Sequence, residues 1–279
     1  MKEQYLNLMW DFMRQAGQIA LKFYNDKQFT LKQDGSVLTQ ADQDISRLIH
    51  QKLDPLTQTG EHILVEEEDP QRGKYLDQQL LERTRFIWSV DPIDGTRLFS
   101  NHMPLFGISI GLIKEFVPWL GMVFFPVLDE LFYANGARAY YIQHPFSERP
   151  QQQEIESVDL DISNQTLFLM SDTFFKNYQW SYDNCRFLVT ACATINLCWP
   201  SIGRACGAMD QSHLWDFAGS WPIVQKAGLQ LRHLKTGEVM DRLDARCFMA
   251  DEHPWRLKDY YIVSSRRNYD ILRNKIIPR

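Results

Sequence analysis

The residues best suited to chemistry are two carboxylates three positions apart, Asp91 and Asp94, in the segment DPIDGT at positions 91–96. Carboxylate oxygens are hard ligands that suit Mg²⁺. Gly95 and Thr96 follow at once, and they offer unobstructed backbone N–H groups and a hydroxyl to a phosphate. Metal ligands and anion donors so close together predict chemistry on a phosphate ester.

Three further carboxylates lie where predicted elements begin or end. Asp42 stands at a predicted helix start, Glu67 closes a predicted strand, and Asp216 heads another predicted helix. Taken alone, each has a structural interpretation, which is a helix N-cap for Asp42 and Asp216 and a solvated acidic turn for residues 66–68. Their occurrence together with the segment at 91–96 favours one shared metal site.

The elements that must position these residues follow from hydrophobic periodicity and turn signals. A hairpin is predicted for residues 29–39 around Asp34-Gly35, and residues 70–84 are predicted to form an exposed excursion. The chain as a whole is predicted to form α+β layers. The predicted helices span 3–25, 40–56, 173–180, 191–201 and 216–227, and the predicted strands span 62–66, 86–90, 106–113, 117–125, 130–134, 139–142, 166–170 and 208–209.

A polar stretch at 143–164, with two prolines and three consecutive glutamines, divides the chain. Such composition is typical of a boundary or a flexible connection. We therefore predict an N-terminal α+β half at 1–145 that contains the metal loop. A C-terminal α/β half at 165–279 is predicted to pack with it as one compact unit.

Composition excludes several classes of partner. A net charge of −5 without a dominant basic block argues against a nucleic-acid surface. No apolar run reaches the ~18 residues that span a bilayer, and the N-terminus lacks the apolar core of a signal peptide. The five cysteines form no C-x-x-C pair, which favours free thiols in a reducing compartment. We expect a soluble, cytoplasmic protein without nucleic-acid or membrane partners.

Four segments together resemble the inositol monophosphatase family, the Mg²⁺-dependent, lithium-sensitive phosphomonoesterases. They occur in the family's order and at about its spacing, and the resemblance covers nearly the whole chain. It implies a layered αβαβα sugar-phosphatase fold, two or three Mg²⁺ ions and a homodimer. The segments are DGSVLTQAD at 34–42, VEE at 65–67, DPIDGT at 91–96 and WDFAG at 215–219.

The resemblance also implies the ligands of the metal ions. Glu67, Asp91 and the backbone carbonyl of Ile93 would hold a first Mg²⁺. Asp91, Asp94 and Asp216 would hold a second, so that Asp91 bridges the two. A weaker third ion would lie near Glu67.

Catalytic and substrate-binding roles are implied in the same way. Asp42 would hydrogen-bond Thr96, and Glu67 with Thr96 would orient a water molecule that the metal activates. The N–H groups of Gly95 and Thr96 would bind phosphate oxygens. The remaining substrate contacts would come from Ala191, Cys192 and Asp210, in segments that depart from the family pattern and leave the substrate open.

The function that follows is hydrolysis of a small phosphorylated polyol such as inositol monophosphate. Residues 94–99 resemble the histidinol-phosphate branch, whereas residues 34–36 and 66–70 resemble the 3′(2′),5′-bisphosphate nucleotidase branch, so both substrates stay as alternatives. Arg97 could take a second phosphate or a carboxylate, or form a surface salt bridge. A non-catalytic member that binds metal and anion is the alternative of another class, and retention of every expected carboxylate argues against it.

Overall fold

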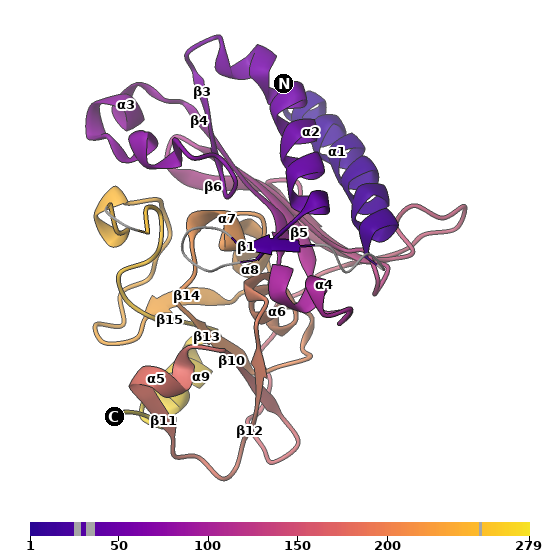
Figure 1. Ribbon diagram of the computed structural model, residues 1–279. Coiled ribbons are helices and arrows are strands. Elements are labelled where there is room, and N and C mark those ends of the chain that lie inside the picture. Colours follow the sequence, from indigo (N-terminus) through magenta and orange to yellow (C-terminus); the bar gives the residue numbers. More distant parts are fainter. Residues whose placement is uncertain (25–28, 32–36, 251–252) are drawn as a thin grey trace.

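The computed structural model describes residues 1–24, 29–31, 37–250 and 253–279. Two sheets alternate with three layers of helices (Figure 1). An outer helix pair covers a seven-stranded sheet, short helices lie between this sheet and a five-stranded one, and further short helices cover the far side of the second sheet. The order of the layers, α-β-α-β-α, is the one predicted.

The outer layer is a pair of amphipathic helices, α1 (Lys2–Phe23) and α2 (Gln40–Thr57). Their apolar faces are buried against the large sheet. Helix α2 begins at a capping box, in which the Asp42 carboxylate accepts the backbone N–H of Thr39 at 2.7 Å. The N-cap is therefore Thr39, and the N-cap role considered for Asp42 is wrong, because Asp42 occupies the third position of the helix.

The large sheet has the strand order β3-β4-β5-β6-β7-β8-β9, in which only the β3–β4 pair is parallel. Side chains alternate between its faces. Trp88 of β4 packs toward α1 and α2, whereas Ile87 belongs to the core on the opposite face. The strands are β3 (His62–Glu66), β4 (Phe86–Asp94), β5 (Gly107–Lys114), β6 (Val117–Phe125), β7 (Glu130–Ala134), β8 (Ala139–Gln143) and β9 (Gln151–Glu154).

Strand β4 runs farther than predicted. The segment from Asp91 to Asp94, expected as a loop, is the end of this strand, and its pairing with β5 shifts register between these two residues. A bulge of this kind bends a strand and redirects its side chains. Gly95 then turns the chain with a φ of 86°, and α4 (Thr96–Ser100) begins.

The middle layer contains α6 (Ala193–Cys198), α7 (Leu214–Phe217) and α8 (Trp221–Lys226). The single helix predicted at 216–227 is wrong, because the chain forms α7 and α8 with a break between them. Pro222 has no N–H to donate to the carbonyl of Ala218, so it can lie only in the first turn of a new helix.

The break between α7 and α8 lies directly against the backbone of the large sheet. A Cβ atom added to Gly121 would lie 2.0 Å from the carbonyl oxygen of Gly219, and one added to Gly111 would lie 2.4 Å from the carbonyl carbon of Ala218. Two glycines in neighbouring strands therefore allow the contact that sets the distance between α7 and the sheet.

The second sheet has the order β12-β10-β13-β15-β14, and its first three strands are parallel. Helices α5 (Phe174–Asn177) and α9 (Arg266–Arg273) form the last layer. The helix predicted at 173–180 ends at Asn177, because the next residues pair with the C-terminal strand. The strands of the second sheet are β10 (Leu167–Ser171), β12 (Arg186–Thr190), β13 (Gly207–Asp210), β14 (Gln230–His233) and β15 (Tyr261–Ser264), and β11 (Tyr178–Trp180) and β16 (Ile276–Pro278) form a separate two-stranded sheet.

Several connecting segments are more ordered than expected. The polar stretch at 143–164 contributes β9 to the edge of the large sheet. The excursion at 70–84 contains a 3₁₀ turn at Arg72–Leu76 and α3 (Gln78–Arg83), with Leu81 buried. The predicted helix at 191–201 ends in a 3₁₀ turn, Pro200–Ile202, and another 3₁₀ turn spans Ala245–Cys247.

Strands β1 (Phe29–Leu31) and β2 (Val37–Thr39) pair antiparallel, as the hairpin prediction requires. The predicted turn at Asp34-Gly35 lies outside the described residues.

The two sheets share one hydrophobic core. Val123 of β6, Leu169 of β10 and Ile223 of α8 belong to the same buried cluster, so the middle helices pack against both sheets. The division of the chain at 145 and 165 stays a prediction. Within the described ranges, no helix combines the length and the apolarity needed to cross a bilayer.

Candidate active site

Three carboxylates from separate parts of the fold converge. Asp91 and Asp94 come from the end of β4, and Asp216 comes from the first turn of α7. One oxygen atom from each lies within 4.8 Å of the others. Asp216 is held by the backbone N–H of His213, which donates to its carboxylate at 2.7 Å. The N-cap of α7 is His213, so the N-cap role considered for Asp216 is wrong.

The cluster concentrates negative charge where water has little access. Burial, and then the charges of Glu67, Asp216 and Asp94, raise the pKa of Asp91 well above its usual range. Burial and Asp216 raise the pKa of Asp94 to about 7. One oxygen of Asp91 is buried without a hydrogen-bond partner among the described residues. Hard oxygen donors, mutual repulsion and an unsatisfied buried oxygen fit a divalent cation such as Mg²⁺.

The start of α6 holds Asp94 in place. Its carboxylate accepts hydrogen bonds from the N–H groups of Ala193 at 3.1 Å and Thr194 at 2.6 Å, and from the Thr194 hydroxyl at 2.5 Å. The Cys192 thiol donates to the same carboxylate at 3.0 Å. Burial and the Asp94 charge raise the pKa of this thiol, which keeps it protonated and able to donate. Cys192, predicted as a substrate contact, thus holds one of the three converging carboxylates.

Glu67 follows β3 and is half-buried. Its N–H donates to the carbonyl of Val90 at 3.3 Å, which fixes its backbone beside β4, and its charge acts on Asp91. Glu67 is not part of the set of three converging carboxylates, although its position next to β4 leaves it close to Asp91. Its predicted role as a metal ligand and base stays a prediction.

The Thr96 hydroxyl donates to the carbonyl oxygen of Ile93 at 2.9 Å. A hydroxyl has one hydrogen, so Thr96 directs it to the carbonyl that is expected to bind metal.

Asp42 accepts hydrogen bonds from the N–H and the hydroxyl of Thr39. The predicted hydrogen bond between Asp42 and Thr96 stays a prediction. Glycine at position 95 allows close packing against neighbouring residues. A Cβ atom there would lie 3.3 Å from both the Leu105 carbonyl oxygen and the Cys192 Cβ.

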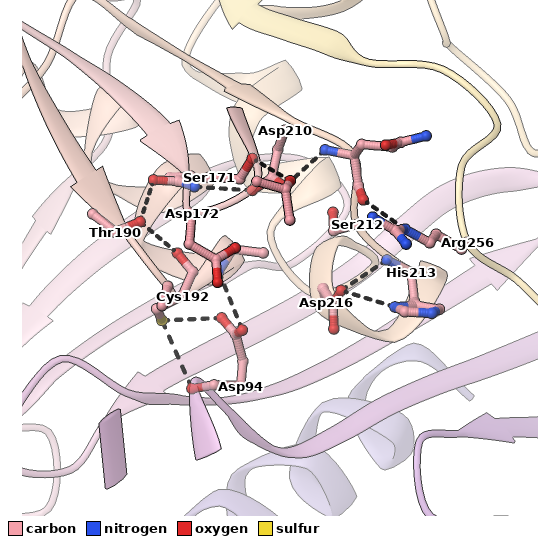
Figure 2. A pocket seen from close by; sticks show the side chains of 15 residues that line it. Asp94, Ser171, Asp172, Thr190, Cys192, Asp210, Ser212, His213, Asp216 and Arg256 are labelled. Carbon is pink, nitrogen blue, oxygen red and sulfur yellow. Dashed lines mark hydrogen bonds and ion pairs between the residues drawn. The ribbon is translucent and has the colours of Figure 1, made fainter. Parts of the chain in front are cut away.

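A pocket of about 180 Å³ adjoins the carboxylates (Figure 2). It lies where the parallel strands β10, β12 and β13 end, because the carboxyl ends of parallel strands meet at one edge of a sheet. Ser171, Thr190 and Asp210 are the last residues of these strands. The residues that line it are Asp94, Ser171, Asp172, Thr173, Thr190, Ala191, Cys192, Ala193, Asn196, Asp210, Gln211, Ser212, His213, Asp216 and Arg256.

Asp210 is fixed within this pocket. Its carboxylate accepts hydrogen bonds from the Asn196 side chain at 2.9 Å and from the backbone N–H of Gln211 at 2.7 Å. The Thr190 hydroxyl donates to the Asn196 side-chain oxygen at 2.6 Å and orients that amide. Burial raises the pKa of Asp210 to about 6. The arrangement provides a preoriented acceptor for a substrate hydroxyl.

The structure therefore brings together most of the predicted site residues. Ala191, Cys192 and Asp210 line the pocket together with two of the converging carboxylates. Sequence reasoning missed Thr194, Asn196 and Arg256. A threonine beside a predicted helix start could have indicated Thr194, whereas nothing local marks the other two, which reach the pocket only through the packing of distant elements.

Comparison with known proteins agrees with the fold. The model of the inositol monophosphatase family matches residues 1–270. The chain belongs to this family of metal-dependent phosphatases, which makes it a phosphoric monoester hydrolase.

Two curated relatives show the range of the family. Inositol monophosphatase 1 of Solanum lycopersicum is 29% identical, and the match covers 81% of this chain and 83% of that protein. The 3′(2′),5′-bisphosphate nucleotidase CysQ of Buchnera aphidicola is 26% identical, and the match covers 86% and 89%. Among solved structures, the inositol monophosphatase of Thermotoga maritima superposes with a TM-score of 0.72 at 19% identity, covering 98% of this chain and 96% of that one. The predicted fold class is thereby confirmed.

Proposed function

We propose that this chain is a Mg²⁺-dependent phosphomonoesterase that hydrolyses a small phosphorylated polyol, with inositol monophosphate as the first substrate to test. The observation that carries the proposal is the convergence of Asp91, Asp94 and Asp216 beside a small pocket at the carboxyl edge of the second sheet. The pocket contains Asp210, a buried carboxylate already fixed by two donors, which suits a hydroxyl of the substrate.

Two or three Mg²⁺ ions would be held by Glu67, Asp91, the Ile93 carbonyl, Asp94 and Asp216. When bound, such ions activate a water molecule and stabilise the charge on the attacking and leaving oxygens of a displacement at phosphorus. This donor set fits, because the carboxylates repel one another and an Asp91 oxygen is otherwise unsatisfied.

The chain itself orients the reacting groups. Glu67 and Thr96 would position the attacking water, with Glu67 accepting its proton. The N–H groups of Gly95 and Thr96 would bind the phosphate oxygens, and the left-handed turn at Gly95 is what allows backbone to approach so closely. Asp210 would accept a hydrogen bond from a hydroxyl of the leaving group. This contact favours a phosphorylated polyol over a simple alkyl phosphate as the substrate.

The related nucleotidase makes a bisphosphorylated nucleoside the main alternative substrate, and histidinol phosphate is the second. Membership of a phosphatase family argues against the non-catalytic alternative.

A cytoplasmic location and a homodimer belong to the same proposal. The five free cysteines of the structure are consistent with a reducing compartment. Sedimentation of the purified protein tests the dimer.

Phosphate release by purified protein tests the function. Inositol 1-phosphate, 3′-phosphoadenosine 5′-phosphate, histidinol phosphate and fructose 1,6-bisphosphate are compared with Mg²⁺ and with chelator. We expect release that depends on Mg²⁺ and is abolished in Glu67→Gln. Release that persists in chelator, or that survives Glu67→Gln, would overturn the site assignment.

A further inference from the structure

A single guanidinium lies among the carboxylates of the pocket. Of the described residues that line it, Asp94, Asp172, Asp210 and Asp216 carry carboxylates, and Arg256 is the one lysine or arginine. The Nε of Arg256 donates to the backbone carbonyl of Gln211 over 3.4 Å, which is a long hydrogen bond (Figure 2). No described carboxylate lies within 4.0 Å of its guanidinium nitrogens. An arginine has five N–H donors, and of these only the Nε–H of Arg256 has a hydrogen-bond partner among the described residues.

The backbone around Arg256 is held at several points. The neighbouring Trp255 is fully buried, with its indole N–H donating to the Arg72 carbonyl at 2.9 Å. Trp255 also has a φ of 67°, a left-handed conformation that is strained for a bulky residue. On the other side, the N–H of Leu257 donates to the Ser212 carbonyl at 3.0 Å. Packing therefore maintains the strained conformation of Trp255. This conformation fixes the backbone position from which the Arg256 side chain extends.

This segment is tied directly to the metal ligands. Arg256 forms an antiparallel bridge with His213, and the N–H of His213 is the donor that holds Asp216 at 2.7 Å. The guanidinium thus lies at the wall of the pocket next to the converging carboxylates. Arg97 differs, because it does not line the pocket, is 66% exposed and lies 3.8 Å from Asp172.

We propose that Arg256 binds a second anionic group of the substrate, a phosphate or carboxylate separate from the ester that is hydrolysed. The inference rests on the proposed function and narrows its substrate class. Planar guanidinium donors match the two oxygens of such a group. A substrate with an ammonium group, such as histidinol phosphate, would instead bring a second positive charge to the guanidinium at this wall.

Matched pairs of substrates test the proposal. The pair 3′-AMP and adenosine 3′,5′-bisphosphate differs by one phosphate, and the pair glycerol 3-phosphate and 3-phosphoglycerate differs by one carboxylate. The readout is the ratio of kcat/KM for the member that carries a second anionic group to that for its partner. We expect Arg256→Gln to lower this ratio about 10- to 100-fold, mainly through KM, as expected for loss of hydrogen bonds to a charged group. Arg256→Lys should restore part of it.

The two pairs distinguish the sources of the anion, because a drop confined to one pair identifies phosphate or carboxylate. The control is Arg138→Gln, which removes an equal charge from the pair with Glu154 on the large sheet and should leave both ratios unchanged. Equal ratios in Arg256→Gln and wild type for both pairs would overturn the proposal.

A binding measurement separates this proposal from the proposed function. Calorimetry of Glu67→Gln with Mg²⁺ compares the affinities for 3′-AMP and adenosine 3′,5′-bisphosphate without turnover. Tighter binding of the bisphosphate that is lost in the Glu67→Gln/Arg256→Gln double variant supports Arg256, whatever the wild-type protein hydrolyses. Equal affinities for both nucleotides would overturn it. Wild-type protein that releases no phosphate from any substrate would overturn the proposed function alone.

Discussion

The Asp94 carboxylate accepts two hydrogen bonds from Thr194, a residue 100 positions farther along the chain. One comes from the backbone N–H at 2.6 Å and the other from the hydroxyl at 2.5 Å. Asp94 ends a strand of the large sheet, whereas Thr194 lies in the first turn of a helix that packs against the second sheet. A carboxylate of one sheet, which we propose as a metal ligand, is thus oriented by the layer that joins it to the other.

Replacing Thr194 by valine tests this relationship. Thr194→Val keeps the shape of the side chain and removes the hydroxyl, and a hydrogen bond to a charged group contributes about 1.5–3 kcal/mol. We expect kcat/KM to fall at least about 10-fold and the Mg²⁺ concentration for half-maximal rate to rise. Thr194→Ser retains the hydroxyl and should keep most of the activity, so equal losses in both variants would contradict the assigned role.

Replacing Asp91 by asparagine should separate stability from activity. Asp91→Asn removes a buried carboxyl group whose ionisation is opposed by burial and by the neighbouring carboxylates. In chelator, we therefore expect a higher Tm than wild type, by roughly 2–4 °C for each kcal/mol gained, together with loss of Mg²⁺-dependent phosphate release. Scanning calorimetry measures the first and phosphate release the second. Asp270→Asn, at an exposed position of α9, is the control of equal charge, and a lower Tm for Asp91→Asn in chelator would contradict this prediction.

Asp210 should make stability depend on pH. Its pKa is raised to about 6 by burial, so the folded protein holds a proton that the unfolded chain has already released. The folded state binds more protons between the unfolded pKa near 4 and the folded pKa, and stability therefore falls as pH rises through this window. The contribution is on the order of 2–3 kcal/mol.

Denaturant unfolding in chelator at pH 4, 5, 6 and 7 measures this effect. Asp210→Asn cannot titrate, so its free energy of unfolding should fall less steeply over this range than that of the wild type. Other buried carboxylates contribute equally to both proteins, and the difference between the two curves isolates Asp210. Parallel curves would show that Asp210 titrates normally in the folded protein.

The contact between Gly121 and the break after α7 should be intolerant of a methyl group. In Gly121→Ala the new Cβ would lie 2.0 Å from the Gly219 carbonyl oxygen, so the helices must shift away from the sheet. We expect a loss of about 1–3 kcal/mol in stability and weaker Mg²⁺ binding, because α7 carries Asp216. Gly73→Ala, whose Cβ would meet only Pro254 at 3.5 Å, is the control. Unchanged Mg²⁺ affinity in Gly121→Ala would show that this contact does not position Asp216.

Elements with a strong local pattern were predictable from the sequence. Helices α1 and α2 and the hairpin-connected strands β5 to β8 follow their apolar periodicity to within a few residues, because each depends on its own amphipathic face and on close neighbours in sequence. The pairing of β11 with β16 brings residues 178–180 against 276–278, and no local pattern indicates such a contact. Strands β12, β14 and β15 were missed, because they are short and take their stability from the surrounding sheet.

The residues of the candidate site likewise divide into those that the sequence predicts and those that it does not. Asp91, Asp94 and Asp216 could be predicted because their motifs are continuous in sequence. The groups that hold or surround them come from elsewhere: Thr194 from α6, and Arg256 from a segment positioned by the burial of its neighbour Trp255. Their roles depend on distances between elements, which periodicity and motif spacing do not contain.

The long separation between Asp94 and Thr194 has a consequence for how the protein acquires its metal. Closing a loop of 100 residues costs chain entropy, which only the packing of both sheets against the middle helices can offset. Partly folded chains therefore present the carboxylates dispersed, with little affinity for Mg²⁺. Under the proposed function Mg²⁺ would bind the folded state selectively, and its binding free energy would add to folding stability as the Mg²⁺ concentration rises. Cellular magnesium would then influence how much of this chain survives quality control as well as how fast it works.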